Sequence, residues 1–182
     1  MRGPLLLPYE GHVPKLHPGA WVAPGATLVG DVELGPDASV WYGCVLRGDV
    51  HRVRVGARTN LQDGCVVHVT AGRFAAEIGD EVSVGHRAVV HGCKVAAGAL
   101  IGIGAIVLDG AEIGEEALVG AGALVTPGSV VPSGVLVLGA PARVVRELSP
   151  AERAEQRART LRYVETARAH ARAAEGARPA TR

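Results

Sequence analysis

An aliphatic residue recurs every six positions along most of this chain, and that period limits the possible folds more than any other feature. The nineteen positions are Val22, Leu28, Leu34, Val40, Leu46, Val55, Leu61, Val67, Ile78, Val84, Val90, Val95, Ile101, Val107, Ile113, Val119, Val125, Val131 and Val137. Three interruptions break the count, because the step from 46 to 55 is three residues too long, the step from 67 to 78 is five too long and the step from 90 to 95 is one too short. A six-residue period predicts a parallel β-helix, in which each repeat is a short strand with a turn and three repeats close one triangular coil.

The composition agrees with a narrow interior. The chain has 25 glycines and only 3% aromatic residues, so small branched side chains must fill the core and small residues must occupy the corners. Successive coils should stack about 4.8 Å apart through parallel hydrogen bonds. The pattern resembles the hexapeptide-repeat proteins, whose β-helix is left-handed, although parallel crossovers are otherwise nearly always right-handed. We therefore expect an all-β fold, a left-handed parallel β-helix of hexapeptide repeats with a C-terminal α-helix.

The repeat ends near residue 148, and the pattern then changes to that of a helix. Ser149, Pro150 and Glu152 have the spacing of a capping box with proline at the first helical position. We expect a β-helix domain with an N-terminal lead-in over 1–148, a helix over 149–174 and a frayed tail over 175–182. A mostly alanine stripe at helical spacing should lie against the β-helix or a neighbouring subunit. This stripe consists of Ala154, Ala158, Leu161, Val164, Ala167 and Ala171.

Charge and cysteine content exclude several classes of protein. Nineteen basic and eighteen acidic residues give a net charge of +1, so no overall field attracts nucleic acid or a membrane surface. The apolar run near the start of the chain is too short for a signal-peptide core. The sequence also contains no run of about 18 apolar residues that would suit a transmembrane helix. Cys44, Cys65 and Cys93 follow no CxxC spacing and take the small inward corner positions. We expect a cytoplasmic protein without nucleic-acid or membrane partners.

The six-residue register places three histidines. His68 and His91 are each the second residue of a repeat, and their repeats are three apart, so the two side chains should be stacked neighbours on one face. His86 is the third residue of the repeat at 84 and belongs to a different face. It can reach the pair only from another subunit, and a closed threefold ring would allow this. The register therefore predicts a homotrimer with one metal site at each interface.

Other polar residues fall near these histidines. Arg47 shares the column of His68 and His91, Gln62 falls on the face of His86, and Asp49 and Asp63 lie beside the two columns. A histidine at an outward position of a β-helix is usually an ordinary surface residue. A stacked pair with an offset third histidine beside these polar groups favours a metal. Three imidazoles suit Zn²⁺, with Fe²⁺ or Co²⁺ as alternatives, and leave one coordination position open. Two further acidic residues are expected at solvated positions, namely Asp109 and Glu112.

The stretches "WYGCVLRGDVHRVRVGARTNLQDGCVVHV" and "IGDEVSVGHRAVVHGC" resemble the γ-class carbonic anhydrases, over residues 10 to 165 approximately. The resemblance implies zinc-dependent hydration of carbon dioxide to bicarbonate. The implied ligands are His68 and His91 of one subunit, with His86 donated across the interface of a trimer. Other implied roles are an interface pair of Arg47 with Asp49, a Gln62 that holds the water or hydroxide on the metal, an acidic Asp63 beside it, and a Tyr163 that approaches the site from the C-terminal helix.

The chain departs from the best-studied members at two points. Val50 follows the Arg-Gly-Asp motif where they carry a glutamate, and the loop "TAGRFAAE" is short, with Glu77 as its one acidic residue. Both departures concern proton transfer, for which His51 or bulk buffer could serve instead. Three alternative functions stay open. They are a metal-dependent hydrolase of coenzyme A thioesters, a hexapeptide-repeat acyltransferase with a metal-free histidine base, and a non-catalytic protein of the ferripyochelin-binding kind.

Overall fold

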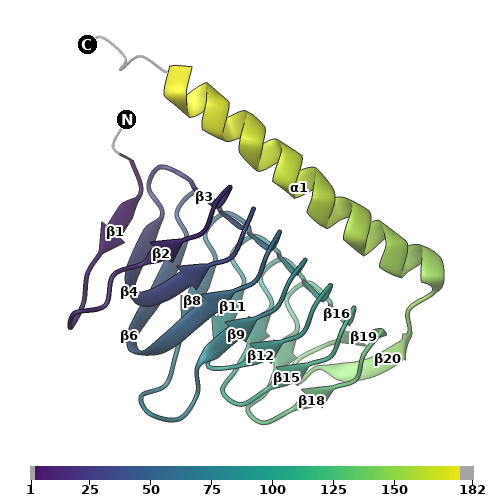
Figure 1. Ribbon diagram of the computed structural model, residues 1–182. Coiled ribbons are helices and arrows are strands. Elements are labelled where there is room, and N and C mark those ends of the chain that lie inside the picture. Colours follow the sequence, from purple (N-terminus) through teal and green to yellow (C-terminus); the bar gives the residue numbers. More distant parts are fainter. Residues whose placement is uncertain (1–2, 177–182) are drawn as a thin grey trace.

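The computed structural model describes residues 3–176, which form short β-strands followed by one long helix (Figure 1). The strands are β1 Leu5–Leu7, β2 Lys15–Leu16, β3 Trp21–Val22, β4 Thr27–Leu34, β5 Ser39–Val40, β6 Val45–Val55, β7 Asn60–Leu61, β8 Val66–His68, β9 Ala76–Ile78, β10 Ser83–Val84, β11 Val89–His91, β12 Lys94–Val95, β13 Leu100–Ile101, β14 Ile106–Val107, β15 Glu112–Ile113, β16 Leu118–Val119, β17 Leu124–Val125, β18 Val130–Val131, β19 Val135–Leu138 and β20 Arg143–Glu147. The helix α1 spans Pro150–Gly176.

The strands wind into a parallel β-helix with three faces. The histidine face consists of β1, β8, β11, β14 and β17 with the first parts of β4 and β6. The charged face consists of β2, β9, β12, β15 and β18 with the last parts of β4 and β6. The helix face consists of β3, β5, β7, β10, β13, β16 and β19, closed by the antiparallel β20. The predicted fold class, a left-handed β-helix of hexapeptide repeats with a C-terminal helix, is confirmed.

The repeated aliphatic residues point inward and stack directly on one another. Leu46 pairs with Val67, and Val67 pairs with Val90 in the next coil. All three are fully buried, and each such side chain stabilises the fold by about 1.5–3 kcal/mol through its removal from water. The interruptions in the repeat are absorbed locally. The longest becomes a loop over residues 69–75, which closes on itself where Thr70 and Phe74 form a bridge.

The outward residues of the three faces differ in kind. On the histidine face, one of the two outward columns is aliphatic, and it runs through Val45, Val66, Val89, Ile106 and Leu124. On the charged face the column alternates in sign at each step, as Lys15, Glu33, Arg54, Glu77, Lys94 and Glu112. Opposite charges directly across a ladder stabilise the pairing of strands. An exposed aliphatic column, in contrast, stabilises a protein only when another surface covers it and removes it from water.

Helix α1 runs back along the β-helix, so that its C-terminal end lies near the start of the chain (Figure 1). The expected capping box is present, because Ser149 N donates to Glu152 Oε2 at 2.9 Å and Glu152 N donates to Ser149 Oγ at 3.3 Å. The helix contacts β3, β5, β7 and β10 of the helix face. The predicted frayed tail over 175–182 lies largely outside the described residues.

The buried side of α1 agrees in part with the predicted alanine stripe, because Val164 and Ala167 of the stripe are buried. Its buried residues are Gln156, Thr160, Val164 and Ala167. Leu161, which the stripe included, is 49% exposed, and Ala154 is exposed as well. The reason is the polar surface of the helix face, which pairs with polar helix residues: Gln156 Nε2 donates to the Glu116 carbonyl at 3.0 Å.

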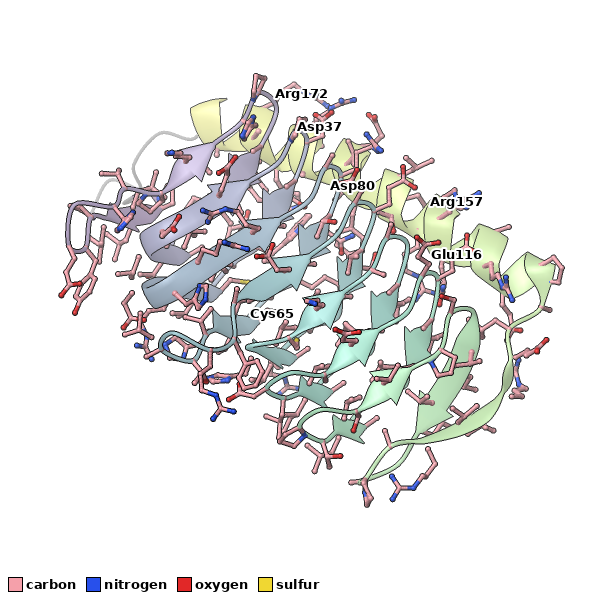
Figure 2. All side chains as sticks on the ribbon, turned by 60° about the horizontal axis from the view of Figure 1, so that its bottom comes forward. Asp37, Cys65, Asp80, Glu116, Arg157 and Arg172 are labelled. Atoms are coloured by element: carbon pink, nitrogen blue, oxygen red, sulfur yellow. The ribbon has the colours of Figure 1, made fainter. Side chains whose placement is uncertain are left out.

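Ion pairs hold one edge of the helix to the β-helix. Figure 2 shows Asp37, Asp80 and Glu116 in a row along the β-helix beside α1. Arg157 Nη2 donates to Glu116 Oε1 at 2.7 Å, and Arg168 Nη2 donates to Asp37 Oδ1 at 3.1 Å. These exposed pairs contribute little energy each, so the buried contacts carry most of the attachment. No helix among residues 3–176 is long and apolar enough to cross a membrane.

The cysteines lie in the interior, as the register predicts. Cys44, Cys65 and Cys93 are buried and unpaired, and Figure 2 shows Cys65 inside the coils. Cys65 Sγ lies 3.1 Å from the Gly85 carbonyl. Burial raises the pKa of Cys93 to about 12, so this thiol stays protonated and unreactive at neutral pH.

Candidate metal centre

His68 and His91 lie side by side on the histidine face, as the six-residue register predicts. The two residues are direct partners in the β8–β11 ladder. Their ring centroids are 5.0 Å apart, and His68 Nδ1 lies 3.0 Å from His91 Nε2. The two imidazoles therefore present one nitrogen each to the same small space.

The other nitrogen of each ring contacts an aspartate. His68 Nε2 lies 3.1 Å from Asp49 Oδ1, and His91 Nδ1 lies 2.5 Å from Asp109 Oδ1. Burial raises the pKa of both carboxyls, but hydrogen bonds outweigh it, from Arg47 and His68 to Asp49 and from Thr70 and His91 to Asp109. Both pKa values therefore lie below the ordinary value, and both aspartates are ionised acceptors at neutral pH. The ring nitrogens that face them must carry the N–H.

The inward nitrogens of two neutral rings are then both acceptors. With both rings neutral in these tautomers, His68 Nδ1 and His91 Nε2 would face each other as acceptors across 3.0 Å, an arrangement that a shared cation stabilises. Burial lowers the pKa of His68, which disfavours a proton there. Two nitrogens on one zinc, each about 2.0–2.1 Å from it, lie about 3.3 Å apart in tetrahedral geometry. The donor set thus suits a divalent metal, with the carboxylate–imidazole pairs typical of such sites.

His86 lies elsewhere in the chain. It follows β10 of the helix face, and its Nδ1 lies 2.9 Å from Asp63 Oδ2. Both side chains are more than 40% exposed. Within residues 3–176 no group of three His, Cys, Asp or Glu side chains is placed to hold a metal. The contribution of His86 from a second subunit stays a prediction.

Gln62 and Tyr163 line one cavity together with His86. The cavity has a volume of about 520 Å³, and its apolar walls include Leu100 and Ile103. Gln62 is buried and donates from Nε2 to Asn60 Oδ1 at 3.1 Å, which leaves its carbonyl oxygen free of that bond. Tyr163 reaches the cavity from α1, and burial raises the pKa of its hydroxyl. Gln62 and His86 share a face, as predicted, because β7 pairs with β10.

Arg47 and Asp49 contact each other within one chain. Arg47 Nη1 donates to Asp49 Oδ2, while the other oxygen of Asp49 faces His68. The resemblance implied a pair across a subunit interface, and that arrangement stays a prediction. Within the chain, Asp49 joins the arginine to the histidine pair. Glu77, the acidic residue of the short loop, pairs with Arg52 at 2.7 Å on the charged face.

Asp109 lies beside the histidine pair, where the sequence did not lead us to expect it. It was expected at a solvated position, but its side chain is only 29% exposed. It accepts a hydrogen bond from Thr70 Oγ1 at 2.7 Å in addition to its contact with His91. The six-residue register could have predicted this position, because Asp109 lies three repeats after Gly92, directly beside the histidine column. Glu112 is exposed and pairs with Lys94, as expected of a solvated position.

Fold and site together define a hexapeptide-repeat β-helix protein in which two paired histidines each contact an aspartate.

No known family model matches the chain. The chain is 54% identical over 143 residues to a probable carbonic anhydrase of Methanocaldococcus jannaschii, and the aligned region covers 79% of this chain and 89% of that protein. It is 51% identical over 163 residues to the mitochondrial γ carbonic anhydrase 3 of Arabidopsis thaliana, covering 87% of this chain and 63% of the plant protein.

A solved structure shares the fold of this chain. A Bacillus cereus protein described as a putative acetyltransferase superposes with a TM-score of 0.90 at 39% identity, covering 92% of this chain and 97% of that one. The chain belongs to the γ-class carbonic anhydrase family of hexapeptide-repeat proteins. The resemblance in the motifs is thereby confirmed.

Proposed function

We propose that this protein is a zinc-dependent carbonic anhydrase that hydrates carbon dioxide reversibly at sites shared between the subunits of a homotrimer. One observation carries the proposal: His68 and His91 present one ring nitrogen each to the same point, 3.0 Å apart, while aspartates contact their other nitrogens. The named relatives support the reaction. Fe²⁺ or Co²⁺ would suit the same ligands.

His68 and His91, with His86 of a neighbouring subunit, would hold the zinc, which would lower the pKa of water there to about 7 and so supply hydroxide at neutral pH. The overall reaction joins one water to one carbon dioxide and gives bicarbonate and a proton. The chain itself holds and orients the reactants. The apolar wall of the cavity, which includes Leu100 and Ile103, suits an uncharged substrate, and the fixed amide of Gln62 can orient water beside it.

The surface of the β-helix supports a trimer. The outward aliphatic column of the histidine face leaves Val45, Val66 and Ile106 each 38–39% exposed in one chain. The charged face carries a ladder of alternating charges that is suited to water, and α1 covers much of the helix face. The histidine face is therefore the apolar surface that association would bury. A threefold ring sets this face of one subunit against a different surface of the next. We propose that the neighbour's surface brings His86 to the histidine pair.

Acyl transfer is the second candidate, because a structural relative is described as a putative acetyltransferase. A metal-free histidine base requires one imidazole with a free acceptor nitrogen and gives no role to a second imidazole directly facing it. The facing nitrogens of His68 and His91 therefore favour the metal enzyme.

Measured hydration of carbon dioxide by the zinc-loaded protein tests the proposal, with His91→Ala as the matched variant. We expect activity in the parent protein and its loss in the variant together with weaker zinc binding. Equal activity in both would refute the proposal. Zinc binding without hydration in the parent protein would favour a thioester hydrolase, which an assay with acyl-coenzyme A substrates would detect, or a non-catalytic binding protein.

A further inference from the structure

We infer that Asp109 is a positioning residue for the metal centre: it fixes the ring of His91 and ties that ring to the loop over residues 69–75. The inference rests on the proposed function, because His91 is taken to be a metal ligand. Asp109 lies three repeats beyond the histidine and is held by contacts on both of its carboxylate oxygens.

Asp109 uses each oxygen for a different partner. Oδ1 lies 2.5 Å from His91 Nδ1, and Oδ2 accepts from Thr70 Oγ1 at 2.7 Å. Thr70 is itself held, because its backbone N donates to the Phe74 carbonyl at 2.9 Å where the loop closes. The bond from Thr70 to Oδ2 therefore restricts rotation of the Asp109 carboxylate, and the carboxylate can restrict rotation of the His91 ring through Oδ1.

The surrounding backbone is shaped to admit this carboxylate. Gly92 N donates to the His68 carbonyl at 2.9 Å, and Gly110 N donates to the Gly92 carbonyl at 2.7 Å, so the chain stacks coil on coil beside the site. A Cβ atom added at Gly92 would collide with Asp109 Oδ1 and would lie 2.9 Å from Phe74 Cβ. A Cβ atom at Gly110 would lie 2.9 Å from the ring of Phe74. The glycines leave the space that Asp109 and Phe74 occupy.

The consequence for His91 is a defined tautomer. An ionised Asp109 accepts a proton-bearing Nδ1, so Nε2 is left as the acceptor that faces His68. Asp49 does the same for His68, and Asp63 contacts His86. Asp109 thus completes a set in which every candidate ligand has its own aspartate. Such partners typically change metal affinity by about 10- to 100-fold.

An ordinary surface pair looks different in this molecule. Glu112 of the next strand pairs with Lys94, and its side chain is 54% exposed with one such contact. Asp109 is about half as exposed and contacts a candidate metal ligand. Glu112→Gln therefore serves as the matched control, because it makes the same carboxylate-to-amide change outside the site.

The test measures Zn²⁺ and Co²⁺ affinity by chelator competition in the full chain, for Asp109→Asn, Asp109→Ala, Thr70→Val and Glu112→Gln. We expect about 10- to 100-fold weaker binding in Asp109→Ala, a smaller loss in Asp109→Asn, which keeps an acceptor oxygen, and a smaller loss in Thr70→Val. Glu112→Gln should bind as the parent does. The visible spectrum of bound Co²⁺ should change in the Asp109 variants and not in the control.

A second readout does not depend on metal. Long-range ¹H–¹⁵N NMR of the metal-free protein reports which nitrogen of His91 carries the proton. We expect Nδ1–H in the parent protein and in Asp109→Asn, and its loss in Asp109→Ala. Parent-like affinity and tautomer in both Asp109 variants would overturn this inference alone, provided that His91→Ala weakens binding. Equal metal binding by the parent protein and His91→Ala would overturn the proposed function and this inference with it.

Discussion

Nδ1 of His68 and Nε2 of His91 face each other across 3.0 Å although the residues are 23 positions apart in the chain. Their closeness follows from the coil length, because β8 and β11 are successive strands of one face and pair His68 with His91 directly. An insertion that shifted one strand by a single residue would turn its histidine toward the core. The centre therefore depends on the register of the whole β-helix between these strands.

Gly92→Ala should weaken metal binding and destabilise the fold. The backbone at Gly92 has a φ of +54°, and the added Cβ would collide with Asp109. Gly104→Ala is the matched control, since its φ is +65° but nothing lies within 4 Å of the added atom. We expect both variants to lose about 1 kcal/mol or more of unfolding free energy from the backbone conformation, measured by urea denaturation. Metal affinity should fall only in Gly92→Ala, and a similar fall in Gly104→Ala would refute the steric explanation.

Leu46→Ala should cost about 2–5 kcal/mol of unfolding free energy, because Leu46 is fully buried between coils that cannot collapse onto the space it leaves. Leu161→Ala on α1 makes the same chemical change at a residue that is 49% exposed. We expect it to change stability by less than about 0.5 kcal/mol. Chemical denaturation of both variants compares them, and equal losses would contradict the placement of Leu161 outside the core.

Gln62→Ala should lower carbon dioxide hydration by about 10- to 100-fold, because the amide beside the cavity would no longer orient water. Zinc affinity should stay near that of the parent protein, since Gln62 contacts Asn60 and neither of the paired histidines. Stopped-flow hydration assays and chelator competition measure the two quantities separately. Loss of zinc together with activity would assign Gln62 to metal retention instead.

The native protein should react slowly with a thiol reagent at pH 8. Cys44, Cys65 and Cys93 are buried, and burial raises the pKa of Cys93 to about 12, so at pH 8 almost none of this group is thiolate. After unfolding in guanidinium chloride, all three thiols should react with the reagent at the rate of an exposed cysteine. Fast modification of a thiol in the native protein would show that the coils open readily.

Much of the architecture could be predicted from the sequence, because a six-residue period has one simple structural meaning. The stacking of His68 on His91 and the separate face of His86 came from counting repeats. Asp109 was misjudged, since an acidic residue at an outward position is usually solvated and the loop that supplies Thr70 interrupts the period. The buried side of α1 was predicted only in part, at Val164 and Ala167. Gln156 and Thr160 were missed because they are polar, and only the polar surface beneath them explains their burial.

The most direct test of the shared centre combines two inactive variants. His86→Ala retains His68 and His91, whereas His91→Ala retains His86, so neither variant alone can form a complete site. When the two are co-expressed in equal amounts and assemble at random into threefold rings, an interface is complete if His86→Ala supplies the pair and His91→Ala supplies the third ligand. About one quarter of the interfaces meet this condition. We predict recovery of about one quarter of the parent's zinc sites and hydration activity, and activity no higher than that of the separate variants would contradict a centre shared between subunits.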